Sequence, residues 1–456
     1  MAKTIRDSAA FRWLVLVMVS LTMFSVYLVT DEFSPLKTFL EIHNGWDSAA
    51  YGWFSSSYSM FNVFLFMLIL GGVAVDKFGI RIAGLGSCLV CLAGVVVQYV
   101  AMRSSMEGTV RFFGNELSRE VFWASIGFAL FGIGSETAGV AATKVIAKWF
   151  TGYEMALAMG AQVALARLGQ AGAMVLPPFV AETFGSASSV VMMGLILVAM
   201  GTVLYLVFMV LDGKLDRQIG ESAQEESEEE FRWEDFVSVL KNPAFWMIAL
   251  LCVLFYSAVF PFQKYATDLM VNKFGVSQTV AGTIPAVLPF GCIFLTPLFG
   301  SIYDTKGHGA DLMILGAGII TVVHVLFAMP FVDKVWMAYA LMALLGIGFA
   351  LLPSALWPSV AKIIPAKQFG TAMSLTFYIQ NIGLWGVPLL IGTVLARFCI
   401  TGQVTEAEGL VRNTYDYTVP SLIFAMFGAV SVLIAIGVKV LDKKKNYHLQ
   451  EPNIQN

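Results

Sequence analysis

The sequence predicts an all-α membrane protein whose twelve transmembrane helices form two six-helix bundles, repeated in parallel orientation. Three observations predict this fold class. The composition is too apolar for a soluble domain, because 58% of the 456 residues are hydrophobic and only 13% are charged. Apolar runs long enough to cross a bilayer recur along the chain. Short motifs of the first half also reappear in the second half at constant offsets.

Runs of about 20 apolar residues predict the individual helices. They cover residues 11–30, 50–73, 80–102, 119–147, 153–179, 187–211, 243–266, 279–302, 309–330, 334–360, 368–396 and 418–440. The first run has a basic flank but no small-residue cleavage site, so we interpret it as a membrane helix and not as a signal peptide.

The orientation follows from the distribution of lysine and arginine among the loops. If the N-terminus is cytoplasmic, the loops on its side hold twice as many of these residues as the loops on the other side. Basic residues collect on the cytoplasmic side of membrane proteins. Both termini are therefore predicted to be cytoplasmic, and Arg167 is the one basic residue that belongs to neither face.

The chain divides at one polar segment near its midpoint. We expect an N-terminal bundle over 1–211, a cytoplasmic linker over 212–241, a C-terminal bundle over 242–445 and a cytoplasmic tail over 446–456. The linker contains the acidic tract ESAQEESEEE at 221–230, which cannot bury apolar surface. Apolar residues then recur at near-helical spacing from Phe231 to Leu240, which predicts either a short helix on the membrane surface or an extension of the seventh span.

The stretch from Gly132 to Gly172 contains one acid, Glu136, and one base, Arg167, in surroundings that are otherwise typical of a membrane interior. A charge near the middle of a bilayer costs on the order of 3 kcal/mol, so such residues usually face a partner or a wet cavity. These two residues are the principal candidates for a binding site.

A loop motif between the second and third helices is repeated in the second half. Gly72, Asp76 and Gly79 correspond to Gly300, Asp304 and Gly307. With Lys77 and Arg81, the first copy resembles the loop signature of the major facilitator superfamily, whose halves are parallel repeats. The resemblance implies gating of the cytoplasmic side by Gly72, Asp76, Lys77, Gly79, Arg81 and Asp304. The second copy is weaker, because Thr305 replaces the first base.

Further segments resemble one branch of this superfamily, the branch that includes the lysosomal dipeptide uniporters. They are YSMFNVFLFMLILGG at 58–72, GIGSE at 132–136, KWF at 148–150, QVALARLG at 162–169 and SALWPSV at 354–360. The resemblance implies that Glu136 and Arg167 hold the two ends of a dipeptide and that transport is uniport.

Helix geometry agrees with this assignment. Glu136 and Arg167 lie almost equally far from the turn at Thr151 and Gly152, about 22 to 24 Å at 1.5 Å per residue, and hence at one depth. A dipeptide carries an ammonium and a carboxylate about 7 Å apart, and arginine can bind a carboxylate through two hydrogen bonds. A buried structural ion pair between the two residues is the alternative.

Neutral side chains are expected to complete the site. At the offset that aligns the two halves here, Glu136 and Arg167 correspond to Ala350 and Asn381, so the charges occur in the first half only. The neutral candidates are Trp357, Tyr378, Gln380, Asn381, Tyr58 and Asn62, which offer amide, phenol and aromatic contacts.

Other functional classes are disfavoured or stay open. The chain has no nucleotide-binding loop, no metal-ligand cluster and no nucleophile–base arrangement, which excludes a typical enzyme and predicts no cofactor or metal. A net charge of −3 without a basic patch argues against nucleic acid, so the expected partners are a small solute and the lipid bilayer, and protein partners are not specified. An organic-anion or carboxylate carrier, a proton-coupled peptide symporter and a non-transporting receptor or scaffold remain as alternatives.

The sequence contains no N-x-[ST] glycosylation acceptor. The loops expected on the noncytoplasmic side are short, which also departs from a glycosylated lysosomal protein. We therefore predict a bacterial inner membrane in preference to a lysosomal one.

Overall fold

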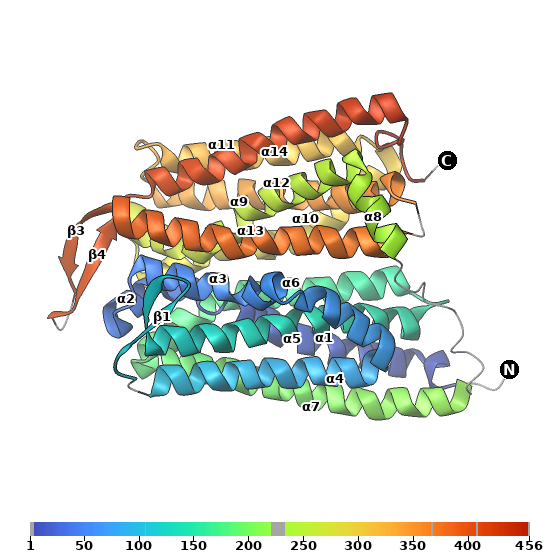
Figure 1. The fold of residues 1–456 in the computed structure, drawn as a ribbon, viewed down its shortest axis with the longest axis horizontal. Helices are drawn as coiled ribbons and strands as arrows, with labels where there is room; N and C mark the ends of the chain where they lie inside the picture. The colour runs from blue at the N-terminus through green and yellow to red at the C-terminus, as the bar shows by residue number, and fades with distance from the viewer. Residues whose placement is uncertain (1–3, 105, 220–232, 366–367, 407–408, 455–456) are drawn as a thin grey trace. The chain divides into compact units, whose positions relative to one another are not determined.

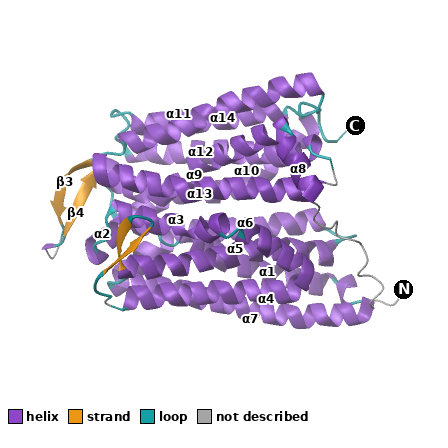
Figure 2. Cartoon of the chain, in the orientation of Figure 1, coloured by secondary structure: helices purple, strands orange, loops and turns teal. Residues whose placement is uncertain are grey.

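A computed structural model describes residues 4–104, 106–219, 233–365, 368–406 and 409–454, and most of these residues are helical (Figures 1 and 2). The acidic tract at 221–230 lies outside the described residues. Within the described part, eleven helical stretches are long and apolar enough to cross a membrane. The all-α class predicted from composition and hydropathy is therefore confirmed.

Close contacts between Cα atoms divide the chain into two units. Unit 1 consists of Met1–Phe33, Ser57–Ala173 and Val180–Glu230, and unit 2 consists of Ser34–Ser56, Met174–Phe179 and Phe231–Asn456. This division differs from a simple split at the linker, because two short segments of the first half belong to unit 2. The reason is local packing, since Tyr51 donates a hydrogen bond to the backbone of Lys264 and the backbone of Met174 lies against Gly282.

Unit 1 is built from helices. They are η1 (Ile5–Asp7), α1 (Ala9–Asp31), α4 (Met67–Arg103), α5 (Arg119–Phe150) and α7 (Ala187–Ile219), with the second part of α3 (Ser48–Phe64), from Ser57 on, and the larger part of α6 (Met155–Phe184). Of these, α1, α5, α6 and α7 follow predicted spans closely. Helices α4, α5 and α7 pack side by side (Figure 1).

The second and third predicted spans are interrupted at different places than expected. Helix α3 ends at Phe64, and Phe66 adopts a φ of 54° before α4 begins. Helix α4 then runs through the predicted loop, and only Gly79, with a φ of 74°, is non-helical within it. Because glycine adopts positive φ without steric penalty, Gly79 can separate the two arms of α4 within a single residue.

Two glycines bring α5 close to its neighbours. A Cβ added to Gly132 would lie 2.0 Å from the carbonyl oxygen of Tyr58 on α3, and one added to Gly134 would lie 2.5 Å from the carbonyl oxygen of Ser87 on α4. Only glycine permits such backbone approach between membrane helices. The GIGSE segment is therefore held between α3 and α4 just before Glu136.

Unit 2 contains the helices of the second half together with a short segment of the first. They are η2 (Ser34–Leu36), α2 (Lys37–Asn44), α8 (Trp233–Lys241), α9 (Pro243–Phe274), α10 (Gln278–Lys306), α11 (Gly309–Ala328), α12 (Val335–Ile363), α13 (Phe369–Phe398) and α14 (Thr418–Lys445). The Asn242 side chain caps α9 by accepting a hydrogen bond from the amide of Ala244. Helix α8 is therefore a separate short helix and not an extension of the seventh span.

Two hairpins, drawn in orange in Figure 2, were not predicted from the sequence. One pairs β1 (Thr109–Phe112) with β2 (Asn115–Ser118), and the other pairs β3 (Ile400–Thr405) with β4 (Val411–Tyr415). In the first, Phe113 and Gly114 connect the strands with φ values of 46° and 78°. Two positive φ values in a two-residue loop are typical of a type I′ turn, whose twist suits a hairpin.

Candidate functional site

Glu136 is held by a short hydrogen-bond chain in unit 1. Its Oε1 accepts a hydrogen bond from the hydroxyl of Tyr58 over 3.1 Å, and that hydroxyl lies 3.0 Å from Oγ of Ser135. Glu136 and Tyr58 are half-buried, whereas Ser135 is buried behind them. The carboxylate is therefore oriented by a hydrogen bond from the neighbouring helix α3.

Arg167 is held by a second chain in the same unit. Its Nη1 donates a hydrogen bond to Oε1 of Gln170 over 2.7 Å, and Nε2 of Gln170 donates to Oδ2 of Asp31 over 2.9 Å. Arg167 is half-buried, whereas Gln170 and Asp31 are buried. The guanidinium thus has buried polar support on the side away from solvent.

Tyr27 on α1 is electrostatically linked to both chains. Its phenol interacts with the charges of Arg167, Glu136 and Asp31. The acid and the base singled out in the sequence therefore act on one common group. Sequence reasoning missed Tyr27 and Gln170, and it did not connect Asp31 with Arg167.

Asn62, a predicted neutral contact on α3, is fully buried. Its Nδ2 lies 3.5 Å from the carbonyl oxygen of Gly132. Its Oδ1 is buried and has no hydrogen-bond partner among the described residues. An unused buried acceptor is costly unless water or a ligand donates to it.

The neutral candidates of the second half all lie in unit 2. Trp357 is half-buried and stacks at a tilt on Phe377, with ring centroids 5.0 Å apart. Gln380 is buried, and its Oε1 lies 3.5 Å from the thiol of Cys252. This contact favours a packing role for Gln380.

The other two candidates on α13 differ from Gln380. Tyr378 is half-buried. Asn381 is buried, and its Nδ2 donates to the carbonyl oxygen of Phe377 over 3.0 Å. Its Oδ1 has no partner within the described chain, as is the case for Asn62. Asn381 is therefore a stronger candidate for a ligand contact than Gln380.

An ion network forms around the first copy of the loop motif. Arg81 pairs with Asp216 over 2.9 Å and with Asp212 over 3.5 Å. Lys148 pairs with the same two acids, over 2.7 and 2.8 Å. Asp212 is fully buried and also accepts a hydrogen bond from Nε1 of Trp149 over 2.9 Å.

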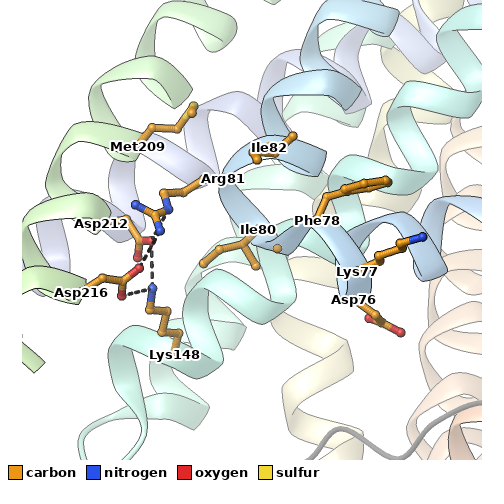
Figure 3. Close-up of a pocket in the computed structure, with 11 residues that line it drawn as sticks. Asp76, Lys77, Phe78, Ile80, Arg81, Ile82, Lys148, Met209, Asp212 and Asp216 are labelled. Atoms are coloured by element: carbon orange, nitrogen blue, oxygen red, sulfur yellow. Dashed lines mark hydrogen bonds and ion pairs between the residues drawn. The ribbon is translucent and has the colours of Figure 1, made fainter. Parts of the chain in front are cut away.

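These residues line a cleft of about 530 Å³ (Figure 3). Figure 3 shows Arg81 and Lys148 pointing toward Asp212 and Asp216, whereas Asp76 and Lys77 point away from them. Asp76 instead pairs with Lys144 on α5. Of the predicted gating residues, Arg81 and Asp76 thus tie α4 to two different helices, and Gly79 supplies the turn between them. A Cβ added to Gly72 would meet no atom within 4 Å.

The second copy of the motif is bound by the C-terminal tail. Oδ1 of Asp304 accepts a hydrogen bond from Asn453 over 2.7 Å, and its backbone carbonyl accepts one from the amide of Ile454. Lys362 donates from Nζ to the carbonyl oxygens of His448 and Glu451, each over 3.0 Å. Leu449 between them is fully buried. The predicted tail residues are therefore packed against the protein as far as 454.

A second buried ion cluster lies in unit 2, and sequence reasoning missed it. Nζ of Lys37 pairs with Asp268 over 3.0 Å and with Glu41 over 3.5 Å. Tyr417 donates to Asp268, and Tyr415 donates to Glu41 over 2.7 Å. Burial raises the pKa of Tyr415 above its ordinary value, so its hydroxyl keeps the proton that it donates. The cluster ties α2 to α9 and to the end of β4.

The described residues offer no group of three histidine, cysteine or acidic side chains that could hold a metal ion. The five cysteines are buried and none of them forms a disulfide.

Comparison with known proteins gives a family match and several relatives. The family model described as Major Facilitator Superfamily matches residues 15–388. A Bos taurus protein named lysosomal dipeptide transporter MFSD1 is 30% identical over 403 residues, which cover 85% of this chain and 80% of that protein. The Homo sapiens protein of the same name is 29% identical over 402 residues, with the same coverage of the two chains.

Solved structures match at lower identity. A bacterial homolog of the human lysosomal transporter Spinster, inward-facing and occupied, gives a TM-score of 0.67 at 13% identity and covers 97% of this chain and 98% of its own. A D-xylose–proton symporter gives a TM-score of 0.68 at 15% identity, covering 94% and 97%. A bacterial homologue of the human drug peptide transporters PepT1 and PepT2 gives a TM-score of 0.63 at 14% identity, covering 95% of this chain and 99% of its own. At these identities the likeness concerns the fold alone.

Proposed function

The chain belongs to the major facilitator superfamily, and from this premise we propose that it carries dipeptides across a membrane by alternating access, as a uniporter. The membership itself identifies a multi-pass membrane transporter and not an enzyme. The substrate class comes from the relatives named as dipeptide transporters and from the chemistry of the candidate site.

The main observation behind this proposal is that one acid and one base, each half-buried, are held by separate series of hydrogen bonds in the same unit. Glu136 is oriented by Tyr58, and Arg167 is oriented by Gln170. A zwitterionic dipeptide presents an ammonium for the carboxylate and a carboxylate for the guanidinium. Charge-assisted hydrogen bonds of this kind are roughly twice as strong as neutral ones.

Neutral groups would bind what lies between the peptide termini. We assign Oδ1 of Asn62 and Oδ1 of Asn381 as acceptors for peptide or side-chain N–H groups, because each is buried and has no partner within the described residues. Tyr58 and Tyr378 offer phenols and Trp357 offers an aromatic wall for the peptide side chains. Gln380 is the weakest of the assignments, since Cys252 already contacts its carbonyl oxygen.

Gating is proposed for the loop motif. In unit 1, Gly72, Asp76, Lys77, Gly79 and Arg81 belong to the segment that is tied to α5 and α7 by ion pairs. In unit 2, Asp304 is tied to the tail. The Asp76–Lys144 and Arg81–Asp216 pairs are partly exposed, and such pairs can break and reform at modest cost, which suits a latch that opens once in each transport cycle.

Proton-coupled symport is the second candidate mechanism. Asp31 is a second acid linked to Arg167 through Gln170, and acids in membrane-spanning helices often serve as proton relays. The choice of uniport therefore depends on the resemblance to the dipeptide uniporters. An organic-anion carrier is disfavoured, because Glu136 would repel a second carboxylate. A receptor or scaffold is disfavoured by the superfamily match and by the relatives named as transporters.

The relatives are named as lysosomal proteins, and this weighs against the bacterial inner membrane predicted from the sequence. The absence of an N-x-[ST] acceptor still separates the chain from a glycosylated lysosomal protein. The localisation that we propose is a multi-pass membrane protein with both termini in the cytoplasm.

Uptake by purified protein in proteoliposomes tests the proposal. Glu136→Gln and Arg167→Ala should each abolish uptake of alanyl-alanine, while Glu116→Gln and Arg111→Ala, at exposed positions of the first hairpin, should leave it unchanged. Dipeptide should compete better than mono- or dicarboxylates. Normal uptake by both site variants would refute the dipeptide assignment. Accumulation above equilibrium in a pH gradient would replace uniport by proton symport.

A further inference from the structure

Gln170 lies between two charges of opposite sign, and this fixes the orientation of its amide. Oε1 accepts from Nη1 of Arg167 over 2.7 Å, and Nε2 donates to Oδ2 of Asp31 over 2.9 Å. A flipped amide would direct its N–H₂ group at the guanidinium and its oxygen at the carboxylate. Both contacts would then be repulsive, since arginine only donates and an ionised carboxylate only accepts.

The position of the amide is also set by close backbone packing. A Cβ added to Gly169 would lie 2.4 Å from the carbonyl oxygen of Phe24 on α1. Helix α6 therefore approaches α1 at the residue that precedes Gln170. This approach brings Gln170 within reach of Asp31, at the last residue of α1.

Asp31 and Gln170 are less exposed to solvent than Arg167. Asp31 is 6% exposed and Gln170 is 2% exposed, whereas Arg167 is half-buried. Arg167 is therefore more exposed than the two residues that hold it. Arginine has five N–H donors in a fixed fork, and once one of them is occupied by Gln170, the orientation of the others is restricted.

We propose that Asp31 and Gln170 are positioning residues that fix the guanidinium of Arg167 for the terminal carboxylate of a peptide. The hydrogen-bonded series Asp31–Gln170–Arg167, called the relay below, then makes a free C-terminus of the peptide a requirement for transport. The inference rests on the proposed dipeptide transport and deepens it. Asp31 holds the amide, the amide holds the guanidinium, and the guanidinium selects peptides that end in a carboxylate over those that end in a neutral amide. Pre-orientation of this kind lowers the entropic cost of binding.

The test compares alanyl-alanine with its C-terminal amide as substrates in proteoliposomes. The relay variants are Gln170→Met, which keeps the length of the side chain, and Asp31→Asn, which keeps its shape. Gln98→Met is the matched control, because Gln98 is also a buried glutamine in unit 1 but lies outside the site. The kcat/KM of each variant is measured for both substrates.

We expect the wild type to prefer the free dipeptide over its amide. Both relay variants should lose about tenfold in kcat/KM for the free dipeptide, through a higher KM, because hydrogen bonds to charged groups are typically worth at least that factor. Uptake of the amide should stay within about twofold of wild type, and its persistence also shows that the variants are folded. Gln98→Met should retain the wild-type preference.

Equal losses on the two substrates would overturn the inference, because they would show a structural role for the relay. An unchanged preference in both variants would also overturn it. If the wild type itself neither binds nor carries alanyl-alanine, the proposed function fails and the inference fails with it. The two failures are thus distinguished by the wild-type result alone.

Discussion

The hydroxyl of Tyr58 donates a hydrogen bond to Oε1 of Glu136 over 3.1 Å, and it lies 3.0 Å from Oγ of Ser135. A phenol has one proton to donate. While it donates to Glu136, Ser135 must donate to the phenol oxygen. This order of donors polarises each bond in the chain and stabilises a charged carboxylate in a site that is otherwise apolar.

Tyr58→Phe should therefore weaken peptide uptake. The variant removes a hydrogen bond to a charged group, worth about 1.5 to 3 kcal/mol, and we expect kcat/KM for alanyl-alanine to fall about tenfold or more. Tyr339→Phe is the matched control, because it removes a hydroxyl that contacts Thr283 in unit 2. Initial uptake rates in proteoliposomes check the prediction. A loss of the same size in the control would indicate a general effect on stability.

Asp212→Asn should destabilise unit 1 and weaken the ion network around the first copy of the loop motif. Asp212 is buried against Lys148, Arg81 and the indole of Trp149. Loss of its charge leaves the two cations with only the partly exposed Asp216 between them. We expect a cost of about 3 kcal/mol, as for other broken buried pairs.

Thermal unfolding in detergent measures this effect. The control is Asp216→Asn, whose side chain is 25% exposed and whose loss should cost only about 0 to 1 kcal/mol. If both variants lower the apparent melting temperature equally, the burial of Asp212 does not increase its contribution to the stability of unit 1.

Lys37→Met should destabilise unit 2 more than any exposed lysine change. Lys37 is fully buried and pairs with both Asp268 and Glu41, so the variant leaves two carboxylates without their cation, at a cost of about 3 to 5 kcal/mol. Lys334→Met, at a pair that is more than half exposed, is the control. Adding Asp268→Leu to Lys37→Met should recover part of the loss. A double variant as unstable as the single one would contradict this explanation.

The predicted orientation can be checked with cysteine labelling. The five native cysteines are buried, and burial raises the pKa of Cys399 to about 11. At pH 8 only about one Cys399 thiol in a thousand is then ionised, and the wild type should resist maleimide.

Gln403→Cys, at an exposed position of β3, should react with a membrane-impermeant maleimide added to the noncytoplasmic side. Lys444→Cys, exposed near the end of α14, should react only after the membrane is permeabilised. The reverse labelling pattern would invert the topology.

Hydropathy and composition predicted the helices well, because each span must bury about 20 residues in lipid and this leaves a long continuous signal. Glu136 and Arg167 could be identified for the same reason, since a charge stands out in an apolar run. Hydropathy does not report where a helix breaks locally. The interruption at Phe66 and the turn at Phe113 and Gly114 depend on single backbone conformations, and they were missed.

The supporting residues were missed for a different reason. Asp31 and Gln170 are 139 residues apart in the chain, and Asn453 and Asp304 are 149 apart. Neither pair has a local pattern, and only the packing of helices brings its members together. Gln170 did carry one readable signal, because it follows Arg167 at a spacing of three residues on a helix, where side chains meet. Sequence reasoning can thus find the charges of the site more easily than the groups that orient them.

The packed C-terminus has a practical consequence for handling the protein. Leu449 is buried and residues 448–454 bind Lys362, Asp304 and the backbone at 308 and 309. An affinity tag or fluorescent protein inserted directly after residue 445 would separate residues 448–454 from the groups that they bind. A fusion partner at this end should follow residue 456 through a flexible Gly/Ser spacer, so that purification and imaging report on a chain with its last turn in place.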